Sequence, residues 1–270
     1  VPLPEGLALV LPTRLGPFLT TRLFSPLEKL RMGLDLVLPR GRLNGDDSVG
    51  AFLRRRLGGA LVERLAGPLV GGIYGTDIDE LSLLAVMPQL REAERKHRSL
   101  LLAGLAGAAK GPAFPASPNR HGAVSLFVSL AGGMGEIVDA LRTALERAPR
   151  SVDIRTATAV EALEPDAHGW VARLSDGPSV PAEAVILAAP APAAARLLDP
   201  IVPAAAAALR TIPFGSTVAV SLGFREEQLP GPPRGHGFLV PPGEGLAISA
   251  CTWSSAKWPG RAPDGFVLVR

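Results

Sequence analysis

A glycine-rich turn between a strand-like run and a helical run is the first pattern in the sequence that could bind a ligand. Gly132-Gly133-Met134-Gly135 follows the strand-like residues 125–130 and precedes a helical run through Ile137, Leu141 and Leu145. Because a helix N-terminus presents unpaired N–H groups and a positive dipole to anions, a phosphate-binding loop is one interpretation. The spacing is G-G-x-G rather than the dinucleotide-binding G-x-G-x-x-G, so a tight strand-to-helix turn is the other.

Side chains that perform nucleophilic, acid–base or metal chemistry are scattered. The sequence holds no G-x-S-x-G motif and no Cys/His pair, and its four histidines lack metal-ligand spacing. The neighbouring carboxylates Glu226 and Glu227 are more typical of a solvated turn than of an acid/base pair. His236 is the histidine that could line a cleft. We therefore predict no metal site and no catalytic side chain.

Two tryptophans near the end of the chain could cover an aromatic cofactor. Trp253 and Trp258 bracket residues 254–257, and an exposed edge of the core is the alternative interpretation. Cys251 lies just before them in an apolar alternating run, where we expect a core side chain. As the single cysteine, it excludes an intramolecular disulfide, which is typical of a reducing compartment.

An arginine run lies on a predicted amphipathic helix. Leu53, Leu57, Leu61 and Leu65 are four residues apart and share one helix face beside Arg54-Arg55-Arg56. Such a helix could rest on an anionic membrane with its apolar face down. A solvated run of charges is the alternative.

Glycines interrupt and follow this helix. Gly58-Gly59 inside it cost about 1 kcal/mol each relative to alanine, so the sequence predicts a close helix contact or a break there. Gly67-Pro68 is predicted to stop the helix. The apolar run that follows contains Gly71, Gly72 and Gly75, which would let the backbone approach something flat.

Residues 1–108 read as helical. Residues 46–48 offer N-cap side chains before the arginine-bearing helix, and Pro88 is suited to the first position of another helix that continues to Gly104. The Pro/Gly/Ser-rich segment 110–122 is the best candidate for a linker.

The second half of the chain alternates short strands and helices. The run Ala184–Ala188 is apolar on both faces, as a buried strand should be. Pro203 opens an alanine-rich helix that runs to Arg210. Further strands are predicted near residues 158–164, 170–175, 180–188, 217–224, 237–240 and 246–252.

Composition narrows the function classes. The 270 residues carry a net charge of +3, and no basic run with interleaved aromatics is present, so we expect no nucleic-acid partner. The longest uncharged helical stretch is shorter than the roughly 20 residues that span a bilayer. The chain begins Val1-Pro2 and ends in the strand-like run 266–270, so we expect it to be a fragment of a longer protein.

The arginine run and the glycine-containing apolar run after it, residues 55–82, resemble a known protein family. The pattern R-R-L-G…E-R-L…P-L-V-G-G-I-Y-G-x-D…E-L-S at residues 55–82 resembles the protoporphyrinogen and coproporphyrinogen oxidases of the flavin amine oxidase superfamily. Similarity continues through S-L-A-G-G-M at 129–134, I-L-A-A-P at 186–190 and G-H-G-F at 235–238. With A-C-T-W and K-W-P at 250–259, the pattern is most similar to the bacterial branch that oxidises coproporphyrinogen III.

The resemblance implies a mixed fold, α+β and α/β. A partial, Rossmann-like FAD-binding domain would combine with an antiparallel-sheet substrate domain and an inserted helical domain that docks on a membrane. Residues 1–108 would form the helical domain, 109–122 a linker, 123–190 part of the FAD-binding domain, and 191–270 part of the substrate domain. A cytoplasmic location, peripheral on the inner face of the cell membrane, follows from the same resemblance.

The resemblance also implies a site and a reaction. Val160 and Trp258 would contact FAD, whereas Gly72 and Phe238 would line the cleft for the porphyrinogen. Six electrons would leave coproporphyrinogen III in three two-electron steps, each pair passing to the flavin as hydride and then to O2, which becomes hydrogen peroxide. The flavin carries the redox chemistry. The substrate's propionates would need an arginine or lysine that the resemblance does not assign, and it implies no oligomeric state.

The sequence departs from the family in three places. The G-x-G-x-x-G motif and the C-terminal flavin segment are not among these residues, and the usual Y-A-G-D reads Tyr74-Gly75-Thr76-Asp77. The 270 residues alone are therefore expected neither to hold FAD tightly nor to turn over. Three alternatives stay open: a protoporphyrinogen IX oxidase, another flavin amine oxidase-type enzyme such as an amine oxidase or carotenoid desaturase, and a non-enzymatic membrane-surface interaction module.

Overall fold

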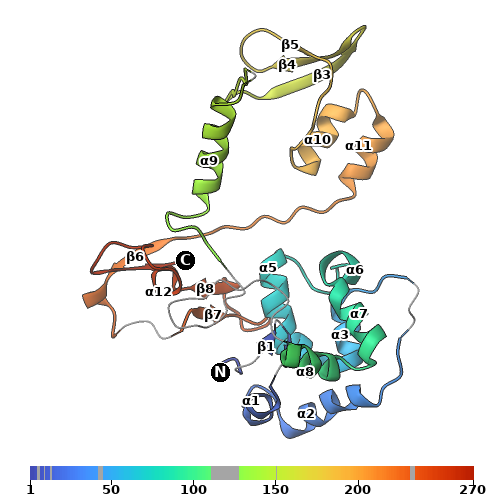
Figure 1. The fold of residues 1–270 in the computed structure, drawn as a ribbon, viewed down its shortest axis with the longest axis vertical. Coiled ribbons are helices and arrows are strands. Elements are labelled where there is room, and N and C mark those ends of the chain that lie inside the picture. Colours follow the sequence, from blue (N-terminus) through green and yellow to red (C-terminus); the bar gives the residue numbers. More distant parts are fainter. Residues whose placement is uncertain are drawn as a thin grey trace. The chain divides into compact units, whose positions relative to one another are not determined.

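The chain folds into two compact units. The computed structural model describes residues 1–4, 7–8, 10–12, 14–41, 45–110, 128–149, 151–231 and 235–270. The larger unit consists of residues 1–134 and 217–270, and the smaller unit of residues 135–216 (Figure 1). The predicted linker begins inside a helix that runs to Lys110, and its residues 111–122 lie outside the described residues. The first half of the strand-like run 125–130 also lies outside them, and residues 128–130 are not in a strand.

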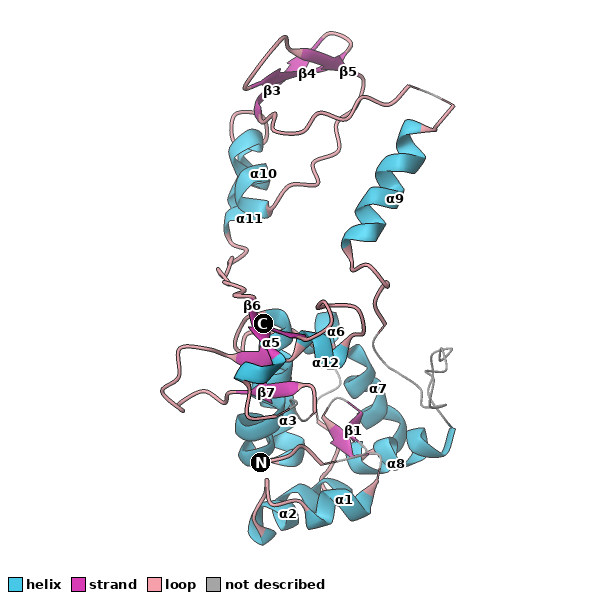
Figure 2. Cartoon of the chain, turned by 90° about the vertical axis from the view of Figure 1, so that its left-hand side faces the viewer, coloured by secondary structure: helices cyan, strands magenta, loops and turns pink. Residues whose placement is uncertain are grey.

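Helices dominate the first part of the larger unit, and short strands its C-terminal part (Figure 2). Its first part contains β1 (Leu7–Ala8), β2 (Leu11–Pro12), α1 (Leu15–Thr20), α2 (Pro26–Gly33), the 3-10 helix η1 (Leu34–Leu36), α3 (Val49–Leu57), α4 (Gly59–Leu61), the π-helix η2 (Val62–Gly71), α5 (Gly72–Tyr74), α6 (Leu83–Val86), α7 (Pro88–His97) and α8 (Leu100–Lys110). Its C-terminal part contains β6 (Leu222–Arg225), η3 (Glu226–Gln228), β7 (Gly237–Leu239), β8 (Ala250–Thr252), α12 (Ser254–Lys257) and β9 (Phe266–Val269).

Helix α3 begins and ends as its sequence predicts. The Ser48 hydroxyl caps it by accepting a hydrogen bond from the Ala51 N–H at 3.1 Å. Gly58 adopts a φ of +90°, which ends the helix, so the predicted interruption is a break. The leucines at the four-residue spacing are all buried in the hydrophobic core, which extends from Val10 to Leu101.

The predicted helix stop at Gly67-Pro68 is wrong, because the helix continues through both residues as the π-helix η2. Proline lacks an N–H, and in an α-helix its ring would clash with the carbonyl four residues earlier. The wider π turn relieves this clash. It also brings the Val62 carbonyl oxygen within 2.9 Å of the place where a Cβ at position 67 would lie, so glycine fits there best.

The arginine run forms ion pairs with carboxylates from other segments. Arg54 pairs with Asp79 at 2.9 Å, and Arg55 pairs with the fully buried Glu94 at 2.9 Å. Arg56 is fully buried, with its guanidinium 2.5 Å from the Asp35 carboxylate. The solvated-run interpretation is therefore wrong for Arg56 but holds for Arg54, which is 45% exposed, and the apolar face of this helix packs into the core instead of facing a membrane.

Arg56 also gathers backbone carbonyls from three segments. Its Nη2 donates to the carbonyl oxygens of Asp35 at 3.0 Å and Arg98 at 2.5 Å, and its Nη1 donates to that of Pro39 at 3.0 Å. Burial alone would raise the pKa of Glu94, but hydrogen bonds from Arg55 and the Gly41 N–H and the charges of both arginines hold it below its usual value.

The single helix predicted from Pro88 to Gly104 is interrupted by the same cluster. Arg98 takes a left-handed φ of +64° and separates α7 from α8. The Asp35 carboxylate accepts hydrogen bonds from the Ser99 hydroxyl at 2.6 Å and the Leu101 N–H at 3.0 Å, which caps α8. A carboxylate far away in the sequence therefore sets where α8 begins.

The smaller unit pairs a helix hairpin with an antiparallel sheet. It contains α9 (Gly135–Glu146), β3 (Val160–Asp166), β4 (Gly169–Leu174), β5 (Val180–Ala182), α10 (Ala191–Leu198) and α11 (Pro203–Arg210). The sheet has the order β3-β4-β5, with Val160 opposite Leu174 and a bulge before Ala162. Strand β3 is therefore an edge strand.

One buried strand is predicted wrongly. Residues 184–188 form no strand, and Ile186 is 92% exposed. None of the described strands pairs with this segment, so no sheet covers its apolar side chains. The helix predicted from Pro203 to Arg210 is confirmed as α11.

The C-terminal part of the larger unit contains two two-stranded antiparallel sheets. Strand β6 pairs with β9, and β7 pairs with β8, so that Phe238 lies opposite Cys251. The mixed class of helices and antiparallel sheets predicted from the sequence is confirmed. The predicted domain division concerns a longer protein and stays a prediction; the compact units seen here divide at residues 134–135 and 216–217.

We predict that Arg56→Met strongly destabilises the larger unit. The substitution leaves Asp35 buried without its cation and Glu94 with Arg55 as its nearest cation, a loss worth about 3–5 kcal/mol. Chemical unfolding in urea, followed by helical circular dichroism, measures it. The control Arg95→Met removes a 64% exposed arginine of α7 and should change the free energy of unfolding by about 0.5 kcal/mol or less. Equal unfolding midpoints for the two variants would contradict the central role of Arg56.

Candidate functional site

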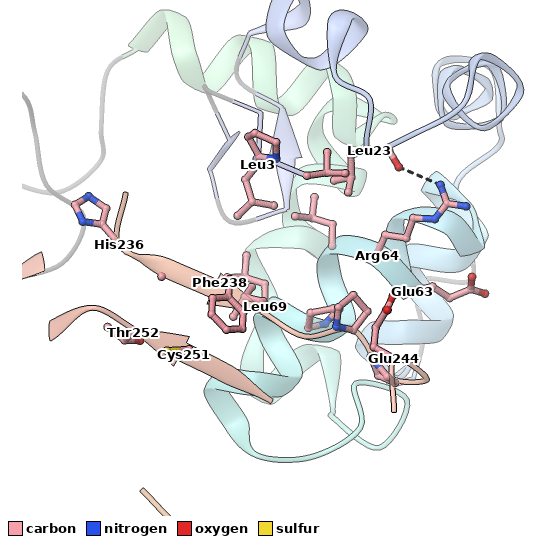
Figure 3. Close-up of a pocket in the computed structure, with 18 of the residues that line it drawn as sticks. Leu3, Leu23, Glu63, Arg64, Leu69, His236, Phe238, Glu244, Cys251 and Thr252 are labelled. Atoms are coloured by element: carbon pink, nitrogen blue, oxygen red, sulfur yellow. Dashed lines mark hydrogen bonds between the residues drawn. The ribbon is translucent and has the colours of Figure 1, made fainter. Parts of the chain in front are cut away.

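A pocket of about 840 Å³ lies within the larger unit, where the β7–β8 hairpin faces the π-helix (Figure 3). Its volume is within the range of roughly 300–1,000 Å³ that is usual for small-molecule sites. The lining comes from residues 1–3, 22–23, 63–65, 68–69, 236–239, 241–242, 244 and 251–252. Segments far apart in the sequence therefore form one cavity.

Apolar side chains enter the pocket from two elements. Phe238 projects from β7, and Leu69 projects from η2 (Figure 3). Gly237, which precedes the phenylalanine, has a φ of +137°, and a Cβ there would collide with the Cys251 carbonyl oxygen on β8. This close backbone approach fixes the hairpin and with it the position of Phe238.

Charged side chains lie around the pocket. Arg64 lines it, and its Nη1 donates to the Leu23 carbonyl oxygen and to the Glu28 carboxylate, each at 3.0 Å. A hydrogen bond from the Ser25 N–H, assisted by Arg64, holds the pKa of Glu28 below its usual value. Arg22 lines the pocket with an exposed side chain, and Glu63 and Glu244 add negative charge.

The pocket contains few groups for acid–base chemistry. His236 lines it, as the sequence analysis considered for this histidine. Cys251 also lines it and is half-buried, so the expected core position for the cysteine is wrong. Among the described residues, no group of three His, Cys, Asp or Glu side chains could hold a metal ion. The arrangement suits the binding of an apolar molecule better than hydrolysis.

The structure brings one of the four predicted site residues, Phe238, into this pocket. Gly72 is an exposed residue of α5, and a Cβ placed on it would meet no atom within 4 Å. Trp258 is half-buried after α12, with the Lys257 Nζ 5.6 Å from its ring centroid. Val160 begins β3 in the smaller unit. All four roles stay predictions.

Sequence reasoning missed Leu69 and Arg64 as lining residues. The four-residue spacing of leucines continues from Leu65 to Leu69 and predicts the core face for Leu69, whereas the π-helix leaves it half-buried at the pocket. The sequence contains no signal for Arg64 either, since its partner Glu28 belongs to another helix.

Comparisons with known proteins identify relatives along the whole chain. A coproporphyrinogen III oxidase from Propionibacterium freudenreichii subsp. freudenreichii is 44% identical over 292 residues, covering 100% of this chain and 54% of the relative. A protoporphyrinogen oxidase from Bos taurus is 33% identical over 228 residues, covering 83% of this chain and 46% of the relative. The chain thus spans about half the length of the curated relatives it matches.

A solved structure has the same fold. It is a protein from Exiguobacterium sp. 255-15 with a provisional assignment as a protoporphyrinogen oxidase, 28% identical, with a TM-score of 0.74. The alignment covers 99% of this chain and 55% of that one. Residues 3–269 match the family described as flavin-containing amine oxidoreductases. The chain belongs to this flavin-containing amine oxidoreductase family.

Proposed function

We propose that these residues are the central part of an FAD- and oxygen-dependent oxidase that converts coproporphyrinogen III to coproporphyrin III. The observation that carries the proposal is the 44% identity to a coproporphyrinogen III oxidase over the complete chain. The match to a protoporphyrinogen oxidase is weaker and covers less of the chain. Protoporphyrinogen IX oxidase is therefore the second candidate.

Each unit offers one residue suited to a contact with FAD. Val160 lies on an edge strand beside a bulge, where outward-facing backbone groups of β3 have no strand partner and can meet an adenine. The half-buried indole of Trp258 can cover an aromatic ring. The sequence contains no G-x-G-x-x-G, so the diphosphate would need a loop that these residues do not supply.

The pocket suits a flat, largely apolar macrocycle. Phe238 and Leu69 supply apolar contacts, and the exposed guanidinium of Arg22 is placed at the lining, where it can meet a carboxylate of the substrate. Gly72 lies outside this lining, and the open space before it would allow the backbone to approach an edge of the ring.

The overall reaction balances as a six-electron oxidation. Coproporphyrinogen III loses six hydrogen atoms, and three molecules of O2 accept them as three molecules of hydrogen peroxide. Bound FAD would supply the two-electron chemistry, whereas protein side chains orient the substrate and exclude water.

The direct test is a substrate comparison with the complete gene product that contains these residues. We expect porphyrin fluorescence and hydrogen peroxide to appear with coproporphyrinogen III, at a kcat/KM at least tenfold above that with protoporphyrinogen IX. The opposite preference would favour the second candidate. Absence of flavin absorbance together with absence of peroxide would refute both.

A glycine pair tests the substrate cleft. Gly72→Leu should fold normally, because position 72 has helical dihedrals and no atom lies within 4 Å of a Cβ there. In the complete protein we expect it to raise the KM for coproporphyrinogen III at least tenfold. The control Gly71→Ala should lower the melting temperature instead, since its Cβ would lie 2.8 Å from the Thr76 carbonyl oxygen. An unchanged KM for Gly72→Leu would remove Gly72 from the site.

The helical part is also proposed to dock on an anionic membrane surface. Leu27, Leu30 and Leu34 share one face across α2 and η1, and the first two are 76% and 66% exposed. The exposed cations of Arg14 and Arg22 lie before and after α1 in the sequence. Among the described residues, no helix has the length and apolar character needed to cross a membrane.

Vesicle flotation tests the docking. The complete protein should float with vesicles containing phosphatidylglycerol, and Leu27→Asp with Leu30→Asp should reduce the bound fraction at least fivefold because the apolar face is lost. The control Leu84→Asp changes a 46% exposed leucine of α6 and should leave binding intact. Equal losses in both variants, or no flotation of the parent, would overturn the proposal.

A further inference from the structure

Arg261 links two segments of the larger unit that are distant in the sequence. Its Nη2 donates to the Ser129 hydroxyl and the Leu130 carbonyl oxygen, each at 2.8 Å, and its Nη1 donates to the Ala131 carbonyl oxygen at 3.2 Å. Three acceptors from consecutive residues thus bind one guanidinium. This planar group, with five N–H donors in a fixed arrangement, can engage all three at once.

The segment that Arg261 holds is the glycine-rich turn. The Gly133 N–H donates to the Leu130 carbonyl oxygen at 3.1 Å, which closes the turn. Gly133 has a φ of +111°, and a Cβ at this position would lie 3.1 Å from the Arg261 Nη1. The turn therefore presents carbonyl oxygens to a cation, which favours a tight structural turn over a phosphate-binding loop.

The other segment carries Trp258. Pro259 and Gly260, with a φ of +77°, connect the tryptophan to Arg261, so the chain reverses direction within three residues. Helix α12 before the tryptophan is held by β9, because the Ser255 hydroxyl accepts from the Leu268 N–H at 3.1 Å. Trp258 thus lies between two anchors, β9 on one side and Arg261 on the other.

We propose that Arg261 is a positioning residue for the flavin site, which fixes the Trp258 indole by fastening its loop to the glycine turn 130–133. The inference rests on the proposed function, since it takes Trp258 as a cofactor contact. A solely structural role would lower stability without changing how flavin binds. If Arg261 positions Trp258, loss of the guanidinium leaves the Trp258 loop disordered in the apo-protein. FAD then binds more weakly, because binding has to order this loop.

The experiment uses the complete gene product and three substitutions. Arg261→Met removes all three hydrogen bonds, and Ser129→Ala removes one acceptor. The control Arg225→Met changes an exposed arginine of the same unit whose guanidinium carbon lies 5.9 Å from the Phe266 ring centroid. Each apo-protein is examined by hydrogen exchange at the Gly133 amide, by FAD titration with quenching of tryptophan fluorescence, and by urea unfolding.

We expect Arg261→Met to raise the exchange rate of the Gly133 amide and the Kd for FAD at least tenfold. Ser129→Ala should raise the Kd about threefold, with no further effect when combined with Arg261→Met. Arg225→Met should match the parent. If the parent binds FAD and Arg261→Met binds it equally well, the positioning role is refuted while the proposed function stands. If the parent binds no FAD, the proposed function fails, and the positioning role with it.

Discussion

The buried guanidinium of Arg56 is the interaction on which the helical part of the chain depends. It touches the Asp35 carboxylate and the carbonyl oxygens of Pro39 and Arg98, and thereby joins η1, the segment after it and the end of α7. Two buried carboxylates, Asp35 and Glu94, balance the two cations Arg55 and Arg56. A charge removed from water is tolerated when an opposite charge and hydrogen bonds compensate it, as the Asp35 carboxylate and the backbone carbonyls do for Arg56. The helices around this cluster hold the π-helix η2 in place. Because η2 forms one wall of the pocket, the pocket also depends on the cluster.

Local patterns predicted those elements whose causes are local. The Ser48 cap, the break at Gly58 and the proline-initiated α11 all follow from the preferences of a few neighbouring residues. The partners of the arginine run could not be predicted, because Glu94 lies 39 residues from Arg55 and no spacing rule connects them. The failed strand at 184–188 has a related cause. Its apolar sequence indicates a buried strand. Burial requires another element to cover these residues, and a short stretch of sequence does not show whether one is present.

The pocket was accessible to sequence reasoning only in part. The family resemblance implied a cleft position for Phe238, the sequence offered one as a possibility for His236, and both residues line the pocket. The opposite wall depends on how a proline is accommodated within a helix, and the residue types at Gly67-Pro68 argue for a helix end rather than a π turn. Family membership identifies the class of cofactor chemistry, whereas the side chains that shape the cavity come from long-range packing that is specific to this chain.

The π turn makes the pocket sensitive to chain length rather than to side-chain identity. Each residue of an α-helix advances the rotation by about 100°, and the wider turns of the ten-residue π-helix reduce that advance, so the residues after them face other directions. Leu69 reaches the cavity and Val70 reaches the core within this helix. A single-residue deletion at Gly67 would rotate the side chains that follow it. Insertions and deletions of one codon here would therefore reshape the cavity in ways that point substitutions do not.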